Sequence, residues 1–368
     1  MTSLKLLFWV NGSATSAAGI RAQQFAQRLP SDWDIDIRYR PVPKWKGIFT
    51  FLQSAAQMRP DVIYVMDAAY AGVLAAYAAQ ILWRCPWIVD TGDLIYELAK
   101  SNGSYGPWQL RLVRWIEQLT TNHADHLVVR GSYHQAMLQE QGIQKVTFIP
   151  DGVDLATCQP LDVTDLRSEL GLGDTLVVGM VGTMSWSSKH QMCYGWDIVE
   201  ALGLLREQPI KALLVGDGNG RARLEARSQA LGITDRVVFT GQVPYADVTR
   251  YVNAMDICVS TQSNDGVGMV RTTGKLPLYL ACGKYVVATD VGEAKKVLPN
   301  IGCLLPYQGV RDDQHPTRLA AHLQALVEHP EQLQSAQQAR ETATRHFDYN
   351  VLAQRVEGVC RSLVPRRP

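Results

Sequence analysis

The sequence has no excess of either charge, no closely paired cysteines and no long apolar run. Lys and Arg total 36 and Asp and Glu total 35, so no overall field favours nucleic acid as a partner. The seven cysteines are scattered without a Cys-x-x-Cys pair, which predicts a reducing compartment and no structural zinc. The apolar run at residues 4–10 ends at Asn11-Gly12, too early for a signal peptide or a membrane span. It predicts a first strand instead.

Low-complexity segments and short repeats are also missing, and the composition is that of a globular protein. Hydrophobic residues make up 46% of the sequence and charged residues 19%, which excludes a disordered chain. With 368 residues, the chain is too long for one ordinary core and fits two domains.

Apolar strand candidates alternate with helical patterns twice along the chain. This alternation predicts parallel sheets covered on both faces, with ligands outside the carboxyl ends of the strands. The strand candidates are residues 4–10, 34–39, 62–66, 87–90, 126–129 and 146–150, then 175–181, 211–215, 237–240, 257–261, 285–289 and 303–306.

The stretch from Asp256 to Gly292 predicts a strand, a glycine-containing loop, a helix and a second strand. A glycine loop that leads into a helix N-terminus offers free N–H groups to an anion. Arg271 and Lys275 are four residues apart, so we expect them on one face of this helix. Cations there oppose the helix dipole, which favours an anionic ligand over a basic turn exposed to water.

The end of this stretch reads KLPLYLACGKYVVATD and resembles the helix–strand signature of family 4 of the retaining, nucleotide-sugar-dependent glycosyltransferases. The family's two glutamates are replaced by Val270 and Leu278. The resemblance implies a GT-B fold: two doubly wound, Rossmann-like α/β domains that face each other across a cleft. It implies an acceptor-side domain at 1–155, a nucleotide-sugar-binding domain at 156–348, and a last helix at 349–368 that packs back on the first domain.

The same resemblance assigns donor-binding residues in the second domain. Thr183 stands where the family often has the arginine of V-G-R, and Tyr194 stands where it has the lysine of K-G. Lys189, between them, either reaches the donor or is a solvated loop lysine. Further candidates come from the V-G-x-G and G-x-V-P segments: Gly182, Gly216, Asp217, Gln242 and Val243.

Arg271 and Lys275 are the expected diphosphate ligands, because charge-assisted donors suit phosphate and arginine forms a bidentate fork. Gly266 and Gly268 lie in the loop before them. Asp265, the acid of this loop, either approaches a sugar hydroxyl as a catalytic residue or caps the turn.

In the first domain, the loop after the first strand resembles the family loop that borders donor phosphate and acceptor. Its candidates are Asn11, Gly12, Gly19 and Arg21. Asp93 follows a strand whose family counterpart reads V-x-x-H-D, and it is either a catalytic residue or the N-cap of a helix that begins at Leu94.

The segment from Trp108 to Leu119 allows two structures: a helix packed within the domain, or one whose Trp108, Arg111, Arg114 and Trp115 form a basic aromatic surface. With Lys44 and Lys46, this surface would suit weak peripheral contact with a membrane. We expect a cytoplasmic protein, peripheral at most to the inner face of the membrane.

The resemblance implies a retaining glycosyltransferase that moves a sugar from a nucleoside diphosphate to a glycan or lipid-linked glycan. No cofactor is expected, and no metal, because the cleft segments have no D-x-D-like cluster. The alternative is a catalytically silent GT-B protein that acts as a binding or regulatory partner, since several family residues are replaced.

Overall fold

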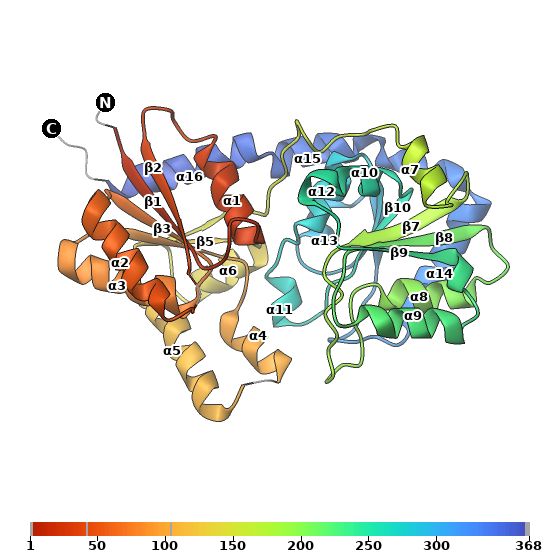
Figure 1. Cartoon of the computed structure of the whole chain (residues 1–368), viewed down its shortest axis with the longest axis horizontal. Coiled ribbons are helices and arrows are strands. Elements are labelled where there is room, and N and C mark those ends of the chain that lie inside the picture. The colour runs from red at the N-terminus through yellow and green to blue at the C-terminus, as the bar shows by residue number, and fades with distance from the viewer. Residues whose placement is uncertain (1–2, 42, 104, 365–368) are drawn as a thin grey trace. The chain divides into compact units, whose positions relative to one another are not determined.

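The computed structural model describes residues 3–41, 43–103 and 105–364, and the chain divides into two compact units (Figure 1). The first unit comprises residues 1–152, 270–272 and 347–368, and the second comprises 153–269 and 273–346. The division after Gly152 lies three residues before the boundary predicted from the sequence. Within the described part of the chain, no helix has the length and apolar character needed to cross a membrane.

The first unit is built on a parallel six-stranded sheet in the order β2-β1-β3-β4-β5-β6. Its strands are short and apolar, and all residues of β3 and β4 are buried, as expected for a sheet covered on both faces. The strands are β1 (Lys5–Val10), β2 (Asp34–Tyr39), β3 (Val62–Met66), β4 (Trp87–Thr91), β5 (His126–Val129) and β6 (Val146–Phe148).

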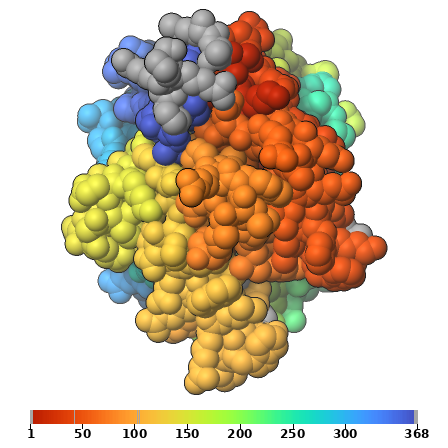
Figure 2. All heavy atoms as spheres, turned by 90° about the vertical axis from the view of Figure 1, so that its left-hand side faces the viewer, coloured from red at the N-terminus to blue at the C-terminus, as the bar shows by residue number. Residues whose placement is uncertain are grey.

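Helices cover both faces of this sheet because successive strand residues point to opposite sides. From β1, Leu7 and Trp9 pack with α2, α3 and α5, and Leu6 and Phe8 pack with α1 and α16. The face that carries α2, α3 and α5 is coloured orange to gold in Figure 2. The helices are α1 (Ala17–Ala26), α2 (Lys46–Met58), α3 (Tyr70–Trp83), α4 (Ile95–Asn102), α5 (Pro107–His123), α6 (Ser132–Glu140) and α16 (Tyr349–Leu363).

The last helix, α16, belongs to the core of the first unit. Its residues Tyr349, Leu352 and Val356 are buried with Phe25 of α1. Asp348 caps the helix by accepting a hydrogen bond from the Asn350 backbone N–H at 2.9 Å.

The second unit repeats the arrangement with a parallel sheet in the order β12-β11-β10-β7-β8-β9. Its strands are β7 (Leu176–Val181), β8 (Ile210–Val215), β9 (Val237–Gly241), β10 (Ile257–Ser260), β11 (Tyr285–Thr289) and β12 (Gly302–Leu305). Its helices are α7 (Thr164–Glu169), α8 (Trp196–Leu204), α9 (Arg221–Ala230), α10 (Val248–Asn253), α11 (Gly266–Met269), α12 (Lys275–Ala281), α13 (Ala294–Val297), α14 (His315–Glu328) and α15 (Ala339–Phe347), with 3-10 helices at Thr234–Arg236, Tyr245–Asp247 and Pro330–Gln338.

Candidate functional site

A pocket of about 510 Å³ lies at the carboxyl ends of β7, β8 and β9 in the second unit. This is the edge of a parallel sheet at which α/β proteins bind ligands. Six residues that the sequence predicts for donor binding line it: Gly182, Thr183, Gly216, Asp217, Gln242 and Val243. The structure therefore brings together residues from three separate segments of the chain.

The two glycine loops of this pocket fit together only because they lack side chains. Gly182 has φ 147° and Gly216 has φ 128°, in the region that disfavours other residues. The Gly182 N–H donates to the Val215 carbonyl oxygen at 2.9 Å. A Cβ on Gly216 would lie 2.1 Å from the Gly182 carbonyl oxygen. The strand ends consequently expose backbone at which a ligand can approach closely.

Lys275, the first residue of α12, supplies a positive charge beside these loops. A Cβ on Gly182 would lie 3.2 Å from its Nζ, which also lies 3.5 Å from the centroid of the Tyr194 ring. Burial of the ammonium group lowers the pKa of Lys275 to about 8. Among the residues that the structure describes, no acid pairs with it. Tyr279, one helical turn on, accepts a hydrogen bond from the Val181 N–H at 2.8 Å and fixes α12 to β7.

The other predicted donor residues lie outside this pocket. Lys189 is exposed on the loop after β7, and Gly266 and Gly268 are in α11. Asp265 caps that short helix, because its Oδ1 accepts from the Gly268 N–H at 2.9 Å and from Ser263 Oγ at 2.8 Å. The capping arrangement is thus present, and the catalytic role of Asp265 stays a prediction.

The expectation that Arg271 and Lys275 share one helical face is wrong. The helix begins only at Lys275, and residues 270–272 pack on the first unit. There, Arg271 Nε and Nη2 both lie 2.5 Å from Asp93 Oδ1, and the Thr272 N–H donates to the Arg130 carbonyl oxygen at 3.1 Å. The sequence did not reveal that the helix begins only after Gly274, because Arg271 and Lys275 keep a helical spacing of four residues across it.

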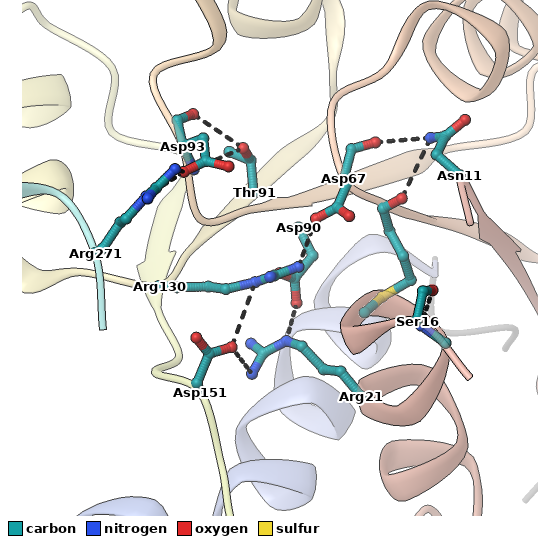
Figure 3. A network of polar contacts seen from close by, with 12 residues as sticks. Asn11, Ser16, Arg21, Asp67, Asp90, Thr91, Asp93, Arg130, Asp151 and Arg271 are labelled. Carbon is teal, nitrogen blue, oxygen red and sulfur yellow. Dashed lines mark hydrogen bonds and ion pairs between the residues drawn. The ribbon is translucent and has the colours of Figure 1, made fainter. Parts of the chain in front are cut away.

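The first unit contains a buried ionic network centred on Asp90, at the end of β4 (Figure 3). The Asp90 carboxylate is fully buried and accepts from Arg21 at 2.9 Å, from Arg130 at 2.8 Å and from the Tyr64 hydroxyl at 3.0 Å. Burial alone would raise the pKa of Asp90, but the two guanidinium groups hold it below its ordinary value. Asp151 lies 3.8 Å from both arginines.

Asp67 and Asp93 extend this network into a second pocket. Asp67 follows β3, accepts from Arg130 Nη2 at 2.8 Å and has φ 66°, a left-handed conformation that aspartate adopts more readily than most residues. Asn11 holds that conformation, because its side-chain amide donates to the Asp67 carbonyl oxygen at 2.7 Å. Both carboxylates line the pocket between α4 and α5, and Figure 3 shows Arg130 and Arg271 directed at them.

The predicted residues of the first loop take structural positions here. Asn11 is buried and joins the ends of β1 and β3, and Arg21 is buried against Asp90. A Cβ on Gly12 would lie 2.5 Å from Ser16 Oγ, and one on Gly19 would lie 2.2 Å from the Ser13 carbonyl oxygen, so both glycines allow the loop to turn tightly.

Asp93 does not cap the following helix, which corrects that alternative. The N-cap of α4 is Leu94, and it has no side-chain cap. Asp93 instead carries the ion pair with Arg271, and its catalytic role stays a prediction.

Asp67 and Arg130 were not predicted from the sequence. The signal for Asp67 was present, because an acid that directly follows a buried strand lies at the ligand-binding edge of a parallel sheet. Arg130 follows β5 in the same way. Within residues 3–41, 43–103 and 105–364, no group of three or more His, Cys, Asp or Glu side chains is placed to hold a metal ion.

Two sequence families match most of the chain. Residues 13–152 match the family described as "Glycosyl transferase 4-like domain", and residues 175–329 match "Glycosyl transferases group 1". The two matches correspond to the two compact units.

Individual relatives have low sequence identity to this chain and match only part of it. The chain is 28% identical to D-inositol 3-phosphate glycosyltransferase of Segniliparus rotundus over 57% of its own length and 45% of that protein. It is 24% identical to alpha-monoglucosyldiacylglycerol synthase of Streptococcus pneumoniae over 70% of its length and 60% of that protein. The chain thus spans about half the length of such curated relatives.

Solved structures extend the similarity to nearly the whole chain. Anabaena HepE in complex with UDP-glucose matches with a TM-score of 0.75 and 20% identity, over 98% of this chain and 100% of that one. This likeness and the two six-stranded parallel sheets confirm the predicted fold, GT-B with two Rossmann-like units. Together with the two family matches, they place the chain among the glycosyltransferases that resemble family 4.

Proposed function

We propose that this protein is a retaining glycosyltransferase that transfers a sugar from a nucleoside diphosphate to an alcohol acceptor. The observation that carries the proposal is the pocket at β7, β8 and β9, where six predicted donor-binding residues meet beside Lys275. The base lies near Gln242 and Val243, and the diphosphate lies against Gly182 and Gly216.

Lys275 takes over the charge that the family supplies from its V-G-R arginine and K-G lysine. Those positions are Thr183 and Tyr194 here. Lys275 Nζ lies over the Tyr194 ring and beside Gly182, so a cation approaches the same loops from α12. The Lys275 ammonium group is half-buried and has no acid partner among the described residues, so an anionic ligand would offset its partial loss of solvation.

The transfer step needs little from the protein beyond position and charge. The acceptor oxygen forms a bond to the anomeric carbon on the face from which the diphosphate leaves, as the bond to the diphosphate oxygen breaks. The leaving diphosphate takes the acceptor proton, and Lys275 stabilises its negative charge. Under this proposal no metal is required.

Relatives support the choice of donor. HepE is described in complexes with UDP and with UDP-glucose. UDP is therefore the first ligand to test. The names of the curated relatives point to different reactions, since one names an inositol phosphate and another names monoglucosyldiacylglycerol as its product, so they do not identify the acceptor of this chain.

A catalytically silent binding protein is the second candidate, and specific replacements favour it. The two family glutamates are Val270, which is fully buried, and Leu278. Asp265, the acid in the neighbouring loop, is engaged as a helix cap. A silent protein would still bind the nucleotide through Lys275.

Donor hydrolysis separates the two candidates. Thermal unfolding is first measured with UDP, GDP, ADP and dTDP, since a ligand at 100 times its dissociation constant adds about 2.7 kcal/mol of stability. The sugar nucleotide of the stabilising base is then incubated with the protein. An active transferase slowly releases sugar to water, and Lys275→Ala abolishes the release. Binding without release supports the silent protein, and binding of none of the four nucleotides contradicts both.

A further inference from the structure

The first unit holds a pocket of about 460 Å³ between α4, α5 and the N-terminal end of α3. A volume of this size suits a small organic ligand. Its wall is mostly apolar and is formed by side chains of the two helices: Ile95, Leu98, Ala99, Leu112, Val113 and Ile116.

The mouth of the pocket carries large exposed side chains. Tyr105, Trp108 and Leu112 are 45%, 67% and 46% exposed, although each is large enough to be favoured in a core. Tyr105 lies just before α5, and Trp108 and Leu112 lie in its first two turns. The segment that contains α4 and the start of α5 is gold, at the lower end of the view in Figure 2. Aromatic side chains with low conformational entropy are common where proteins bind ligands.

The lining is more polar where the segments after β3 and β4 meet the pocket, and Asp67 and Asp93 lie there. Each carboxylate is already neutralised by an arginine, Arg130 and Arg271 respectively. None of the described residues that line the pocket is lysine or arginine. A hydroxyl group, which donates to carboxylate oxygens, fits this part of the pocket, whereas a phosphate or carboxylate would face two acids without a free cation.

We propose that this pocket binds the acceptor, and that the acceptor is an amphipathic alcohol. Its apolar body lies between α4 and α5, and its hydroxyl-bearing head lies at Asp67 and Asp93. This inference rests on the proposed function, because it identifies the acceptor class of the transferase.

Calorimetry with n-octyl β-D-glucoside below its micelle concentration tests the proposal, and glucose serves as the ligand without a chain. The wild-type protein binds the octyl glucoside and binds glucose far more weakly. Leu112→Asp places a charge in the apolar wall and weakens binding of the octyl glucoside at least about tenfold. Leu82→Asp is the matched control, because Leu82 is 62% exposed on α3 and does not line the pocket. This variant binds like the wild type.

UDP binding, measured in the same samples, separates this proposal from the proposed function. Leu112→Asp leaves UDP affinity unchanged, because the nucleotide lies in the second unit. If the wild-type protein binds UDP but not octyl glucoside, only the acceptor proposal is overturned. If it binds neither ligand, the proposed function is overturned as well. The proposal that this pocket binds the acceptor is also contradicted if all three proteins bind octyl glucoside equally well. The same holds if the protein binds only to lipid vesicles and Leu112→Asp does not change that binding.

Discussion

Lys275 and Arg271 have different neighbours, and this difference decides which cation meets the diphosphate. The sequence favours Arg271, because a guanidinium group can donate two parallel hydrogen bonds to a phosphate. In the structure, that group is engaged by Asp93, whereas no described acid pairs with Lys275. We therefore expect Lys275→Ala to weaken nucleotide binding more than Arg271→Ala does.

The pKa of Lys275 predicts how UDP binding depends on pH. Because its free ammonium has a pKa of about 8, it loses its proton as the pH rises through that value, and UDP affinity should fall by up to about tenfold per pH unit. The second phosphate ionisation, near pH 6, is complete by then. Lys275→Arg keeps its charge and should flatten the curve. Parallel curves for the two proteins from pH 7 to 9 would refute this role of Lys275.

Asp90 predicts a large stability effect in the other unit. Asp90→Asn leaves Arg21 and Arg130 buried with too little negative charge, so the free energy of unfolding should fall by about 3–5 kcal/mol. Glu341→Gln is the control, because Glu341 and Arg345 are both exposed, and it should change stability by less than about 0.5 kcal/mol. Urea titration measures both, and similar values for the two variants would show that the network contributes little.

At the scale of elements, the sheets were predictable and the irregular segments were not. Strands β2, β3, β5 and β11 have the bounds expected from their apolar runs, because buried parallel strands leave a continuous signal. The segment at residues 270–272 was expected to lie near the helix N-terminus, but the helix begins only at Lys275.

In the candidate site, too, only residues that belong to a local sequence pattern were predicted. The glycines of the donor pocket were found because a strand-to-helix turn requires them. The pairing of Arg271 with Asp93 and the placement of Asp67 beside Arg130 join residues far apart in the chain, and no local pattern encodes them.

Helix α5 gives a prediction about membranes. Trp108, Arg111, Arg114 and Trp115 are all exposed, which is the arrangement that a peripheral contact requires. Few charges are available, at about 1 kcal/mol each near an anionic surface, so most of the protein should stay in solution when floated with anionic liposomes at physiological salt. Flotation that is strong and sensitive to salt would contradict this and favour a membrane-embedded acceptor.

On the scale of the whole molecule, the fold is retained while residues of the family signature have changed. HepE shares the fold at 20% identity, yet this chain has Thr183, Tyr194, Val270 and Leu278 at positions where the family has charged residues. A transferase with these replacements needs another source of positive charge in the donor pocket. The proposed donor binding therefore depends on the contact between the diphosphate and Lys275.

Calorimetry with UDP and with uridine tests that contact most directly, on the wild type, Lys275→Ala and Lys189→Ala. Lys189 is the control, because it is an exposed lysine on the loop after β7, whereas Lys275 Nζ lies beside Gly182 of the donor pocket. We predict that Lys275→Ala weakens UDP binding by about 2 kcal/mol, roughly 30-fold, while Lys189→Ala has no effect and uridine binds all three proteins equally. Equal UDP affinity in all three proteins would contradict the account.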